Sequence, residues 1–294
     1  MDMPRRPRFD AAQILEAAKS AGILGAGAQT GFGLVAALFD PIMTVDGLAA
    51  LVSTEAVICA RVLRVANSPF YGQRRRVTTV DHAFVILGFD AIRGIAAAVC
   101  LDRSLTPMAI DRPVDVQALL HHSVATAAAA ESLGRLRRPD LASHAFVAGL
   151  LHNLGILVQA QLDPHGVGAM IESGRSDPGF DIRSLESQHA AVGHEECVAS
   201  IFESWQLPTG LAEAARHHHN PAEATEAHRD LAILVGLGAQ LAARSGSGSL
   251  LEPRHAHWVG TASEALRLTE QHMAQVADEL PERVADLRAT VTGA

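Results

Sequence analysis

The residue type that stands out in this chain of 294 residues is histidine, which occurs 15 times. Several histidines are adjacent, as in His121-His122 and in the triplet His217-His218-His219. Histidine is the commonest metal ligand and titrates close to neutral pH, so these runs are candidates for a metal site or for proton transfer. Hydrolysis at a metal site also needs carboxylates, because they supply negative charge for divalent cations. The central question is therefore whether acidic residues accompany the histidines.

The elements that position these histidines are predicted to be helices. Hydrophobic residues make up 48% of the chain but aromatic residues only 4%, and no alternating strand pattern extends beyond about five residues. Apolar periodicity predicts an all-α protein with around a dozen helices. The predicted helices of the later chain span residues 116–133, 141–161, 164–173, 189–205, 209–217, 229–244, 262–280 and 281–291.

Charge and cysteine content restrict the classes of function. The chain has 24 basic and 32 acidic residues, a net charge of −8, so general binding to nucleic acid is not expected. Cys59, Cys100 and Cys197 are far apart and form no CxxC pair, which favours buried thiols in a reducing compartment.

Neither a leader nor a membrane segment is expected. The first ten residues contain arginines but no apolar run followed by a cleavage site. The most apolar stretch, 145–162, is interrupted by His152, Asn153 and Gln159, which is typical of a core helix. We therefore expect a cytoplasmic protein without a membrane partner.

Two glycine-containing features of the chain predict loops. Residues 22–33 are rich in glycine but match no phosphate-binding fingerprint. The run 245–249 alternates serine and glycine and is predicted to be a flexible linker or loop tip.

Two segments carry a family resemblance. The first runs from Arg61 through Asn67-Ser68 to Gly72 and continues with Thr79 to Gly88, and the second is Ala145-Phe-Val-Ala-Gly-Leu-Leu-His152-Asn153-Leu-Gly155. They are followed by His189-Ala-Ala-Val-Gly193, Trp205-Gln-Leu-Pro208 and His217-His218-His219-Asn-Pro221. In this order and spacing the segments resemble the HDOD family, a bacterial relative of the HD-type metal phosphohydrolases.

The resemblance covers roughly residues 34–243 and implies a domain plan. The plan is an N-terminal helix and glycine-rich segment (1–33), an HDOD domain (34–244) and C-terminal helices (250–294). The HDOD domain would consist of an N-terminal helical lobe (34–104) and an HD-like lobe (105–244). Family members mostly act in signal transduction, which makes a signalling protein the expected partner.

The resemblance also assigns positions to the ancestral metal ligands. His122 resembles the early histidine of an HD hydrolase, and His152 matches the histidine of its His-Asp pair. Asn153 stands where the aspartate of that pair would be, and the distal aspartate corresponds to Ala239. Both carboxylates are therefore missing.

Further histidines resemble those that related cyclic-dinucleotide phosphodiesterases recruit. They are His189, His217 and His218, so the expected vestigial metal site consists of His122, His152, His189, His217 and His218. No catalytic residue and no resident cofactor are expected. Three or more neutral imidazoles could nevertheless hold a divalent metal such as Zn²⁺ or Ni²⁺, and less well Mn²⁺.

Three functions follow from this pattern. The first is a non-catalytic regulatory protein that acts by binding a protein or ligand. The second is a metal-dependent phosphohydrolase or phosphodiesterase that uses the retained histidines. The third is a sensor whose vacated metal pocket binds a small anion or nucleotide.

A second candidate site lies in the N-terminal lobe. Arg61 and Arg64 share a helix face, and Asn67 and Ser68 follow at its end. These residues either stabilise the helix end, or contact an anion or partner together with the arginines at 74–76.

The remaining histidines match no motif and are expected to be ordinary surface or helix-end residues. They are His82, His144, His165, His228, His255, His257 and His272.

Overall fold

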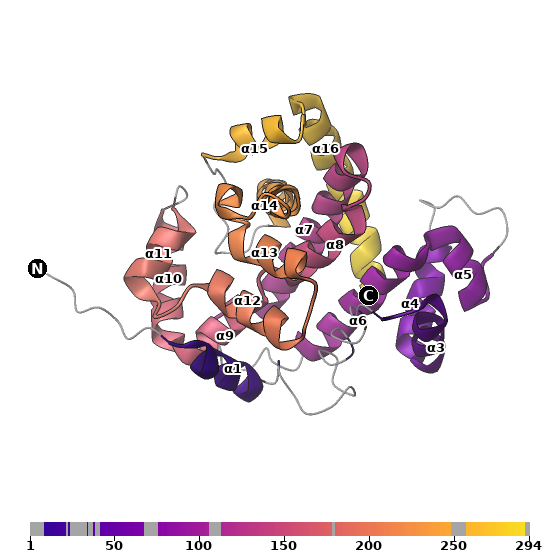
Figure 1. Cartoon of the computed structure of the whole chain (residues 1–294), viewed down its shortest axis with the longest axis horizontal. Coiled ribbons are helices and arrows are strands. Elements are labelled where there is room, and N and C mark those ends of the chain that lie inside the picture. The colour runs from indigo at the N-terminus through magenta and orange to yellow at the C-terminus, as the bar shows by residue number, and fades with distance from the viewer. Residues whose placement is uncertain are drawn as a thin grey trace, which may run out of the picture.

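The structure is a computed structural model that describes residues 9–21, 23, 34, 38, 42–67, 76–105, 113–177, 180–247 and 257–291. Within these residues every regular element is a helix, so the all-α prediction is confirmed (Figure 1). The glycine-rich run 24–33, Ser68 and the arginines at 74 and 75 lie outside the described residues.

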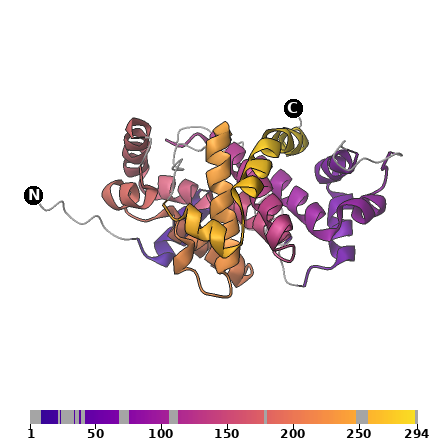
Figure 2. The same cartoon turned by 90° about the horizontal axis from the view of Figure 1, so that it is seen from above.

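The N-terminal part of the chain forms a lobe to one side of the molecule (Figures 1 and 2). Threonines start two of its helices, because the side chains of Thr44 and Thr79 accept hydrogen bonds from Gly47 and His82 backbone N–H groups. The helices of this part are α1 (Ala11–Ser20), α3 (Val45–Thr54), α4 (Ala56–Ala66), α5 (Val80–Leu87) and α6 (Phe89–Leu105). Helix α1 is the exception in position, since it packs against the second lobe.

The HD-like lobe is built around one long helix, α7 (Val116–Arg137), which packs against its neighbours α8 and α14. The other elements of this lobe are α8 (Ala142–Leu151), α9 (Leu154–Leu162), α10 (Pro164–Ser176), α11 (Ile182–His189), α12 (His194–Ser204), α13 (Thr209–His217), the 3₁₀ turn η3 (Pro221–Glu223), α14 (Arg229–Ala242) and the π-helical turn η4 (Ala243–Ser247). Helix α6 packs on α7 and α8 and so connects the two lobes.

Two C-terminal helices complete the fold, α15 (Val259–Ala265) and α16 (Glu270–Val291). Helix α16 packs along α7 and also contacts α4 and α6 of the N-terminal lobe. Arg283 on α16 forms an ion pair with Glu131 of α7. This helix therefore contacts both lobes.

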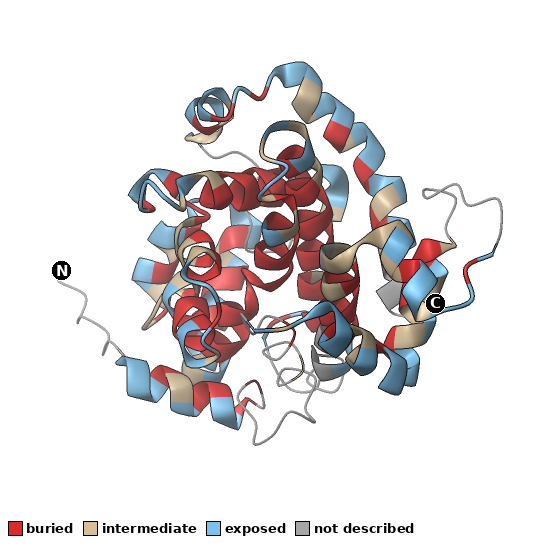
Figure 3. Ribbon diagram, turned by 45° about the vertical axis from the view of Figure 1, so that its right-hand side comes forward, coloured by how far each residue is buried: buried red, intermediate tan, exposed pale blue. Residues whose placement is uncertain are grey.

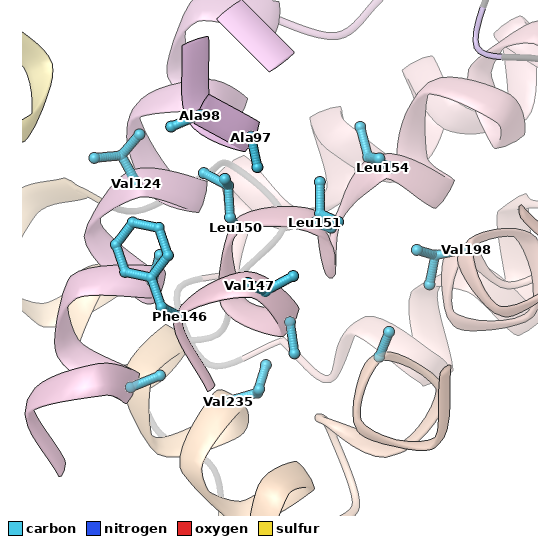
Figure 4. Close-up of a cluster of buried hydrophobic side chains, with 14 of the residues drawn as sticks. Ala97, Ala98, Val124, Phe146, Val147, Leu150, Leu151, Leu154, Val198 and Val235 are labelled. Atoms are coloured by element: carbon cyan, nitrogen blue, oxygen red, sulfur yellow. The ribbon is translucent and has the colours of Figure 1, made fainter. Parts of the chain in front are cut away.

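The apolar core lies where α7, α8, α9, α12 and α14 meet (Figure 3). Val124, Phe146, Leu150, Val198 and Val235 contribute to it from four different helices (Figure 4). The inner helices α7, α8, α9 and α14 are buried over most of their length. Because they have no wide solvent-exposed face, their sequences are only weakly amphipathic.

Several predicted element boundaries are wrong. The single helix expected over 141–161 is broken at His152 and Asn153 into α8 and α9, because Asn153 adopts φ −98° and ψ 7°. The helix expected over 189–205 is instead the end of α11, a turn and then α12. At the C-terminus α16 continues through Pro281, where a new helix was expected.

The predicted flexible linker at 245–249 is also partly wrong. Residues 243–247 form η4, in which Gly246 adopts a φ of 86° that few other residues tolerate. The side chain and carbonyl of Ser247 are bonded to two histidines of α7. This segment is therefore part of the ordered structure around the site.

One helical stretch, 142–162, is long and apolar enough to cross a membrane by length and composition, and a bent pair, Val80–Leu87 with Ala91–Cys100, also passes the test when taken together. The first stretch comprises α8 and α9, and 89% of its apolar window is buried inside the fold. A helix in the core of a folded protein passes the same test, so passing it is weak evidence for a membrane span.

Candidate functional site

Five buried histidines form one cluster in the HD-like lobe. His122 lies on α7, His152 follows α8, His194 begins α12, and His218 and His219 follow α13. Ring centroids are 5.5 Å apart for His122 and His152, 4.8 Å for His152 and His218, and 5.3 Å for His194 and His218. His219 lies 4.0 Å from His218 and 5.1 Å from His194. The rings thus form a continuous series.

Helix ends, rather than helix interiors, supply most of these side chains. His152 lies in the break between α8 and α9, His194 is the first residue of α12, and His218 and His219 come directly after α13. At a helix end the backbone direction changes within one or two residues, so neighbouring side chains can point to a common centre.

Two glycines allow the backbone to approach closely enough to form this cluster. A Cβ atom at Gly155 on α9 would lie 1.9 Å from the carbonyl oxygen of His194. A Cβ atom at Gly236 on α14 would lie 2.3 Å from the carbonyl oxygen of His218. Real Cβ atoms do not approach other atoms this closely, so both helices need glycine where they pass a histidine.

The Nδ1 atoms of two central histidines are held by backbone carbonyls. His152 Nδ1 donates to Gly149 O at 2.7 Å, and His218 Nδ1 donates to Ala215 O at 2.7 Å. A carbonyl oxygen can only accept, so Nδ1 carries the proton in each ring and the neutral imidazole presents an Nε2 lone pair. His152 Nε2 is buried and has no hydrogen-bond partner among the described residues.

A buried carboxylate holds the third ring. Glu186 Oε1 accepts from His194 Nδ1 at 2.6 Å, from the His194 backbone N–H at 2.8 Å and from Gln159 Nε2 at 2.8 Å. Burial alone would raise the pKa of Glu186, but the interactions with His194 and Gln159 outweigh it and hold that pKa below its usual value. Glu186 is therefore ionised at neutral pH and fixes His194 with its Nε2 toward the cluster.

His122 differs because both of its ring nitrogens are bonded within the protein. Its Nδ1 donates to Ser247 O at 2.9 Å, and its Nε2 lies 3.3 Å from the hydroxyl oxygen of Thr126. The Nε2 of the neighbouring His121 lies 3.1 Å from the Ser247 hydroxyl oxygen. His122 thus links α7 to η4 rather than presenting a vacant nitrogen.

Four of the five rings of the cluster are uncharged at neutral pH. Burial lowers the pKa of His122 from 6.5 to about 4. Burial, followed by the proximity of the other rings, also holds the pKa values of His152, His218 and His219 well below the usual value. These imidazoles are therefore uncharged and able to act as lone-pair donors.

Carboxylates are missing from the positions that an HD hydrolase would use. Asn153 is buried, and its Oδ1 has no hydrogen-bond partner among the described residues. The buried stretch 231–242 of α14 contains no aspartate or glutamate, whichever residue of it corresponds to the distal aspartate. Among the described residues the buried acids are Glu131, which pairs with Arg135 and Arg283, and Glu186, which holds His194.

One carboxylate lies at the edge of the cluster. Glu195 follows His194, and its carboxylate lies 3.6 Å from the Arg183 guanidinium and interacts with the backbone N–H of His219. Burial raises the pKa of Glu195 to about 7, although His194 and Arg183 act in the opposite direction. Arg183 also pairs with Glu223 at 3.2 Å, so this edge is polar.

The structure brings together three of the five predicted site histidines, His122, His152 and His218. His189 instead pairs with Ser173 at the end of α11, and half-buried His217 faces Glu213 and Glu223 at 3.9 Å. Their expected membership of a metal site is not supported by this placement.

Sequence reasoning missed His194, His219 and Glu186. Gly193 immediately before His194 indicates a helix break. This break favours His194 over His189 as the site histidine of this segment. His219 was recognised only as part of a triplet. Nothing in the sequence marks Glu186 among the 32 acidic residues of the chain.

The N-terminal candidate site has a structural component. Asn67 Nδ2 donates to Leu63 O at 2.6 Å and to Val77 O at 2.8 Å, and Asn67 Oδ1 accepts from Val77 N–H at 2.8 Å. Asn67 therefore ties the end of α4 to the chain before α5. Arg61 is half-buried and Arg64 exposed on α4, and their expected anion or partner contact stays a prediction.

Most of the unassigned histidines lie at the surface, as expected. His82, His144, His165 and His257 are exposed, and His228 and His272 are half-buried, whereas His255 lies outside the described residues.

A helical lobe with a central histidine cluster, joined to a smaller helical lobe, defines the class of HD-like proteins. Residues 28–221 match the family model of the HDOD domain. The chain belongs to the HDOD family.

Several solved structures have a similar fold. A candidate signal transduction protein from Marinobacter aquaeolei VT8 is 26% identical, with a TM-score of 0.71 over 97% of this chain and 66% of the other. An HDOD domain protein from Geobacter sulfurreducens is 18% identical, with a TM-score of 0.72 over 95% of this chain and 97% of the other. A candidate phosphohydrolase from Shewanella amazonensis SB2B is 22% identical, with a TM-score of 0.66 over 95% and 98%.

This chain spans only part of some relatives. A curated protein from Treponema pallidum is 25% identical over 200 residues, which are 68% of this chain and 38% of that protein. The Marinobacter and Treponema proteins therefore contain regions with no counterpart here.

Proposed function

We propose that this chain is a regulatory protein of signal transduction that acts by binding and does not hydrolyse phosphate esters. The Marinobacter relative is a candidate signal transduction protein, which supports the coarser part of the proposal. The finer part, the lack of catalysis, rests on the chemistry of the histidine cluster. A cytoplasmic location and a signalling protein as partner belong to the same proposal.

The observation that carries the proposal is the substitution of both HD carboxylates. A pair of divalent ions that activates water for attack on phosphorus needs anionic ligands to balance its charge. Asn153 offers a neutral amide oxygen, and residues 231–242 of α14 offer no acid. His122, in the position of the early ligand, is bonded at both nitrogens.

The direct test is a hydrolysis assay on the purified chain. Nucleotides, cyclic dinucleotides and a chromogenic phosphodiester are incubated with Mn²⁺, Mg²⁺ or Ni²⁺. We expect no turnover above that of a His152→Ala variant. Turnover that requires Mn²⁺ and is lost in this variant would contradict the proposal and favour the phosphohydrolase alternative.

A gain-of-function variant tests whether the missing carboxylates limit metal binding. Asn153→Asp combined with Ala239→Asp returns two carboxylates, and Asn153→Asp with Gln240→Asp covers a register shift of one residue in α14. We expect at least one double variant to bind Mn²⁺ more tightly than the natural chain does. Equal, negligible Mn²⁺ binding by all three proteins would show that the missing acids are not the limiting feature.

The anion-sensor alternative is less well supported by the cluster itself. An anion in a buried site needs positive charge or several N–H donors, whereas three of these rings are neutral with their Nδ1 protons engaged by carbonyl oxygens. A thermal-shift screen with phosphate, nucleotides and cyclic dinucleotides tests it, because a ligand specific for the native state raises Tm.

A further inference from the structure

Three histidines of the cluster form a set of nitrogen donors with no assigned role. One ligand atom each from His194, His218 and His219 lies within 4.8 Å of the other two. These side chains are 1%, 0% and 9% exposed, respectively. We propose that His194, His218 and His219 bind a single divalent transition-metal ion of the zinc type. This proposal rests on the proposed function only where it treats the ion as a signal.

The distance between two of the donors fits such an ion. His194 Nε2 and His218 Nε2 are 3.4 Å apart. Ligands of a tetrahedral Zn²⁺ with Zn–N distances of about 2.0–2.1 Å are separated by roughly 3.3 Å. The two nitrogens are therefore already at the spacing that a shared ion requires, and a small movement of His219 would supply the third.

Hydrogen bonds at Nδ1 aim the Nε2 atoms of two rings at each other. His218 Nδ1 donates to Ala215 O, and His194 Nδ1 donates to Glu186 Oε1. The two Nε2 atoms therefore face each other at 3.4 Å in a buried site. A cation between them would be coordinated by both.

The surroundings match those of metal-binding histidines. Such residues usually donate the second ring N–H to a carboxylate or backbone carbonyl, which fixes the tautomer and increases the basicity of the ligand. Glu186 performs this role for His194, and the Ala215 carbonyl performs it for His218. The adjacent His152 Nε2 is a further buried lone pair without a partner among the described residues.

The donor set also predicts which metals bind. Imidazole nitrogens suit Zn²⁺, Ni²⁺ and Co²⁺, whereas Mg²⁺ and Mn²⁺ prefer oxygen ligands. His219 is the most exposed of the three and lies beside Glu195 and Arg183, so this edge of the site is the one nearest to solvent.

The ion would connect two parts of the lobe that the chain separates. Glu186 and His194 belong to the α11–α12 turn, whereas His218 and His219 follow α13. Binding to the native state alone stabilises that state by linkage, so metal occupancy would fix this junction. A regulator could use that difference to report the availability of the metal.

The test is titration calorimetry on the purified, EDTA-treated full chain with ZnCl₂. We expect one Zn²⁺ per chain, and Kd values for MgCl₂ and MnCl₂ at least about 100-fold weaker. His219→Ala should weaken Zn²⁺ binding at least about 100-fold, while the adjacent His217→Ala should change it less than about threefold. No Zn²⁺ binding by the natural chain, or equal losses in both variants, would overturn the proposal.

A second measurement uses the natural chain, so its result does not depend on whether a variant folds. CoCl₂ added to the natural chain should produce visible absorption bands of four-coordinate Co²⁺, and ZnCl₂ should abolish them. Colourless or only six-coordinate Co²⁺ would contradict the site.

If metal binds and phosphodiester turnover also appears, the proposed non-catalytic function fails and the site stands. If neither occurs, the site fails and the regulatory proposal stands.

Discussion

The two halves of the histidine cluster differ in what holds their nitrogen atoms. The first half consists of His122, His152 and Asn153 and contains no carboxylate, and His122 is bonded at both nitrogens to Thr126 and Ser247. In the second half, His194, His218 and His219, two Nδ1 atoms are held by oxygens and two Nε2 atoms meet at 3.4 Å. The first half therefore offers no anionic ligand, whereas two rings of the second half are already oriented toward each other.

This difference teaches that residues matching the HD motif and residues oriented to bind a metal can be different members of one cluster. The catalytic signature is read from Asn153 and from residues 231–242 of α14, neither of which contains an acid. Binding of a metal without catalysis needs only the donors and the groups that orient them. Glu186, which no catalytic motif includes, is the charged group that survives beside the second half.

The largest expected effect comes from the helix crossing that positions the second half. Gly155→Ala places a methyl group where the His194 carbonyl oxygen lies, so α9 and α12 must separate. We expect a loss of about 3 kcal/mol or more in the free energy of unfolding, measured by urea denaturation. Gly260→Ala on α15, which would meet open space, is the matched control and should be neutral or stabilising by up to about 1 kcal/mol. Equal effects of the two substitutions would contradict the role of the crossing.

Acid should act on the first half through His122. The folded-state pKa of His122 is about 4 and lies below the unfolded value of 6.5, so unfolding takes up a proton between these values. Its contribution to stability is complete above pH 6.5 and falls by up to about 1.4 kcal/mol per pH unit as the pH drops toward 4. In EDTA, His122→Asn should therefore make the unfolding free energy less dependent on pH across this window. An unchanged slope would count against a neutral, buried His122.

A smaller effect is expected from the carboxylate behind the second half. Glu186→Gln removes the charge that accepts from His194 and Gln159. We expect a loss of about 1–3 kcal/mol in unfolding free energy and Zn²⁺ binding weakened by about 10–100-fold. The control is Glu203→Gln, because the exposed Glu203–Arg216 pair should contribute less than about 1 kcal/mol. Zn²⁺ binding equal in the two variants would show that Glu186 does not position a ligand.

The smallest effect is expected at the two predicted histidines that lie outside both halves. The double variant His189→Ala/His217→Ala removes a contact with Ser173 and two long contacts with acids. Unfolding free energy should change by less than about 1 kcal/mol, and Zn²⁺ binding should stay within about threefold. Loss of the metal in this variant would assign the site to the residues that the sequence first suggested.

More of the fold than of the candidate site could be predicted from the sequence. Helical periodicity and the resemblance predict the all-α class, and the helices predicted over 209–217 and 229–244 agree with α13 and α14 to within two residues. The errors fall where polar residues interrupt a helix, as at His152 and Asn153, or where Pro281 lies inside one. Tertiary packing decides such cases, because a buried helix can contain a polar residue or end at it.

The histidine assignments show why a site is harder to predict. His189 and His194 are five residues apart, and only the turn between α11 and α12 decides which one reaches the interior. His217, His218 and His219 are consecutive, so in a helix they would point in three directions about 100° apart. Helix α13 ends at His217, and this turns both following side chains inward. A sequence pattern does not locate a helix end to one residue.

The most direct test of the account is a crystal structure of the chain soaked with ZnCl₂, with anomalous scattering recorded at the zinc edge. We predict a single anomalous peak in the cluster, bonded to His194, His218 and His219 at about 2.0–2.1 Å. A peak bonded to His122 and Asn153, or no peak anywhere in the cluster, would contradict the comparison between the two halves.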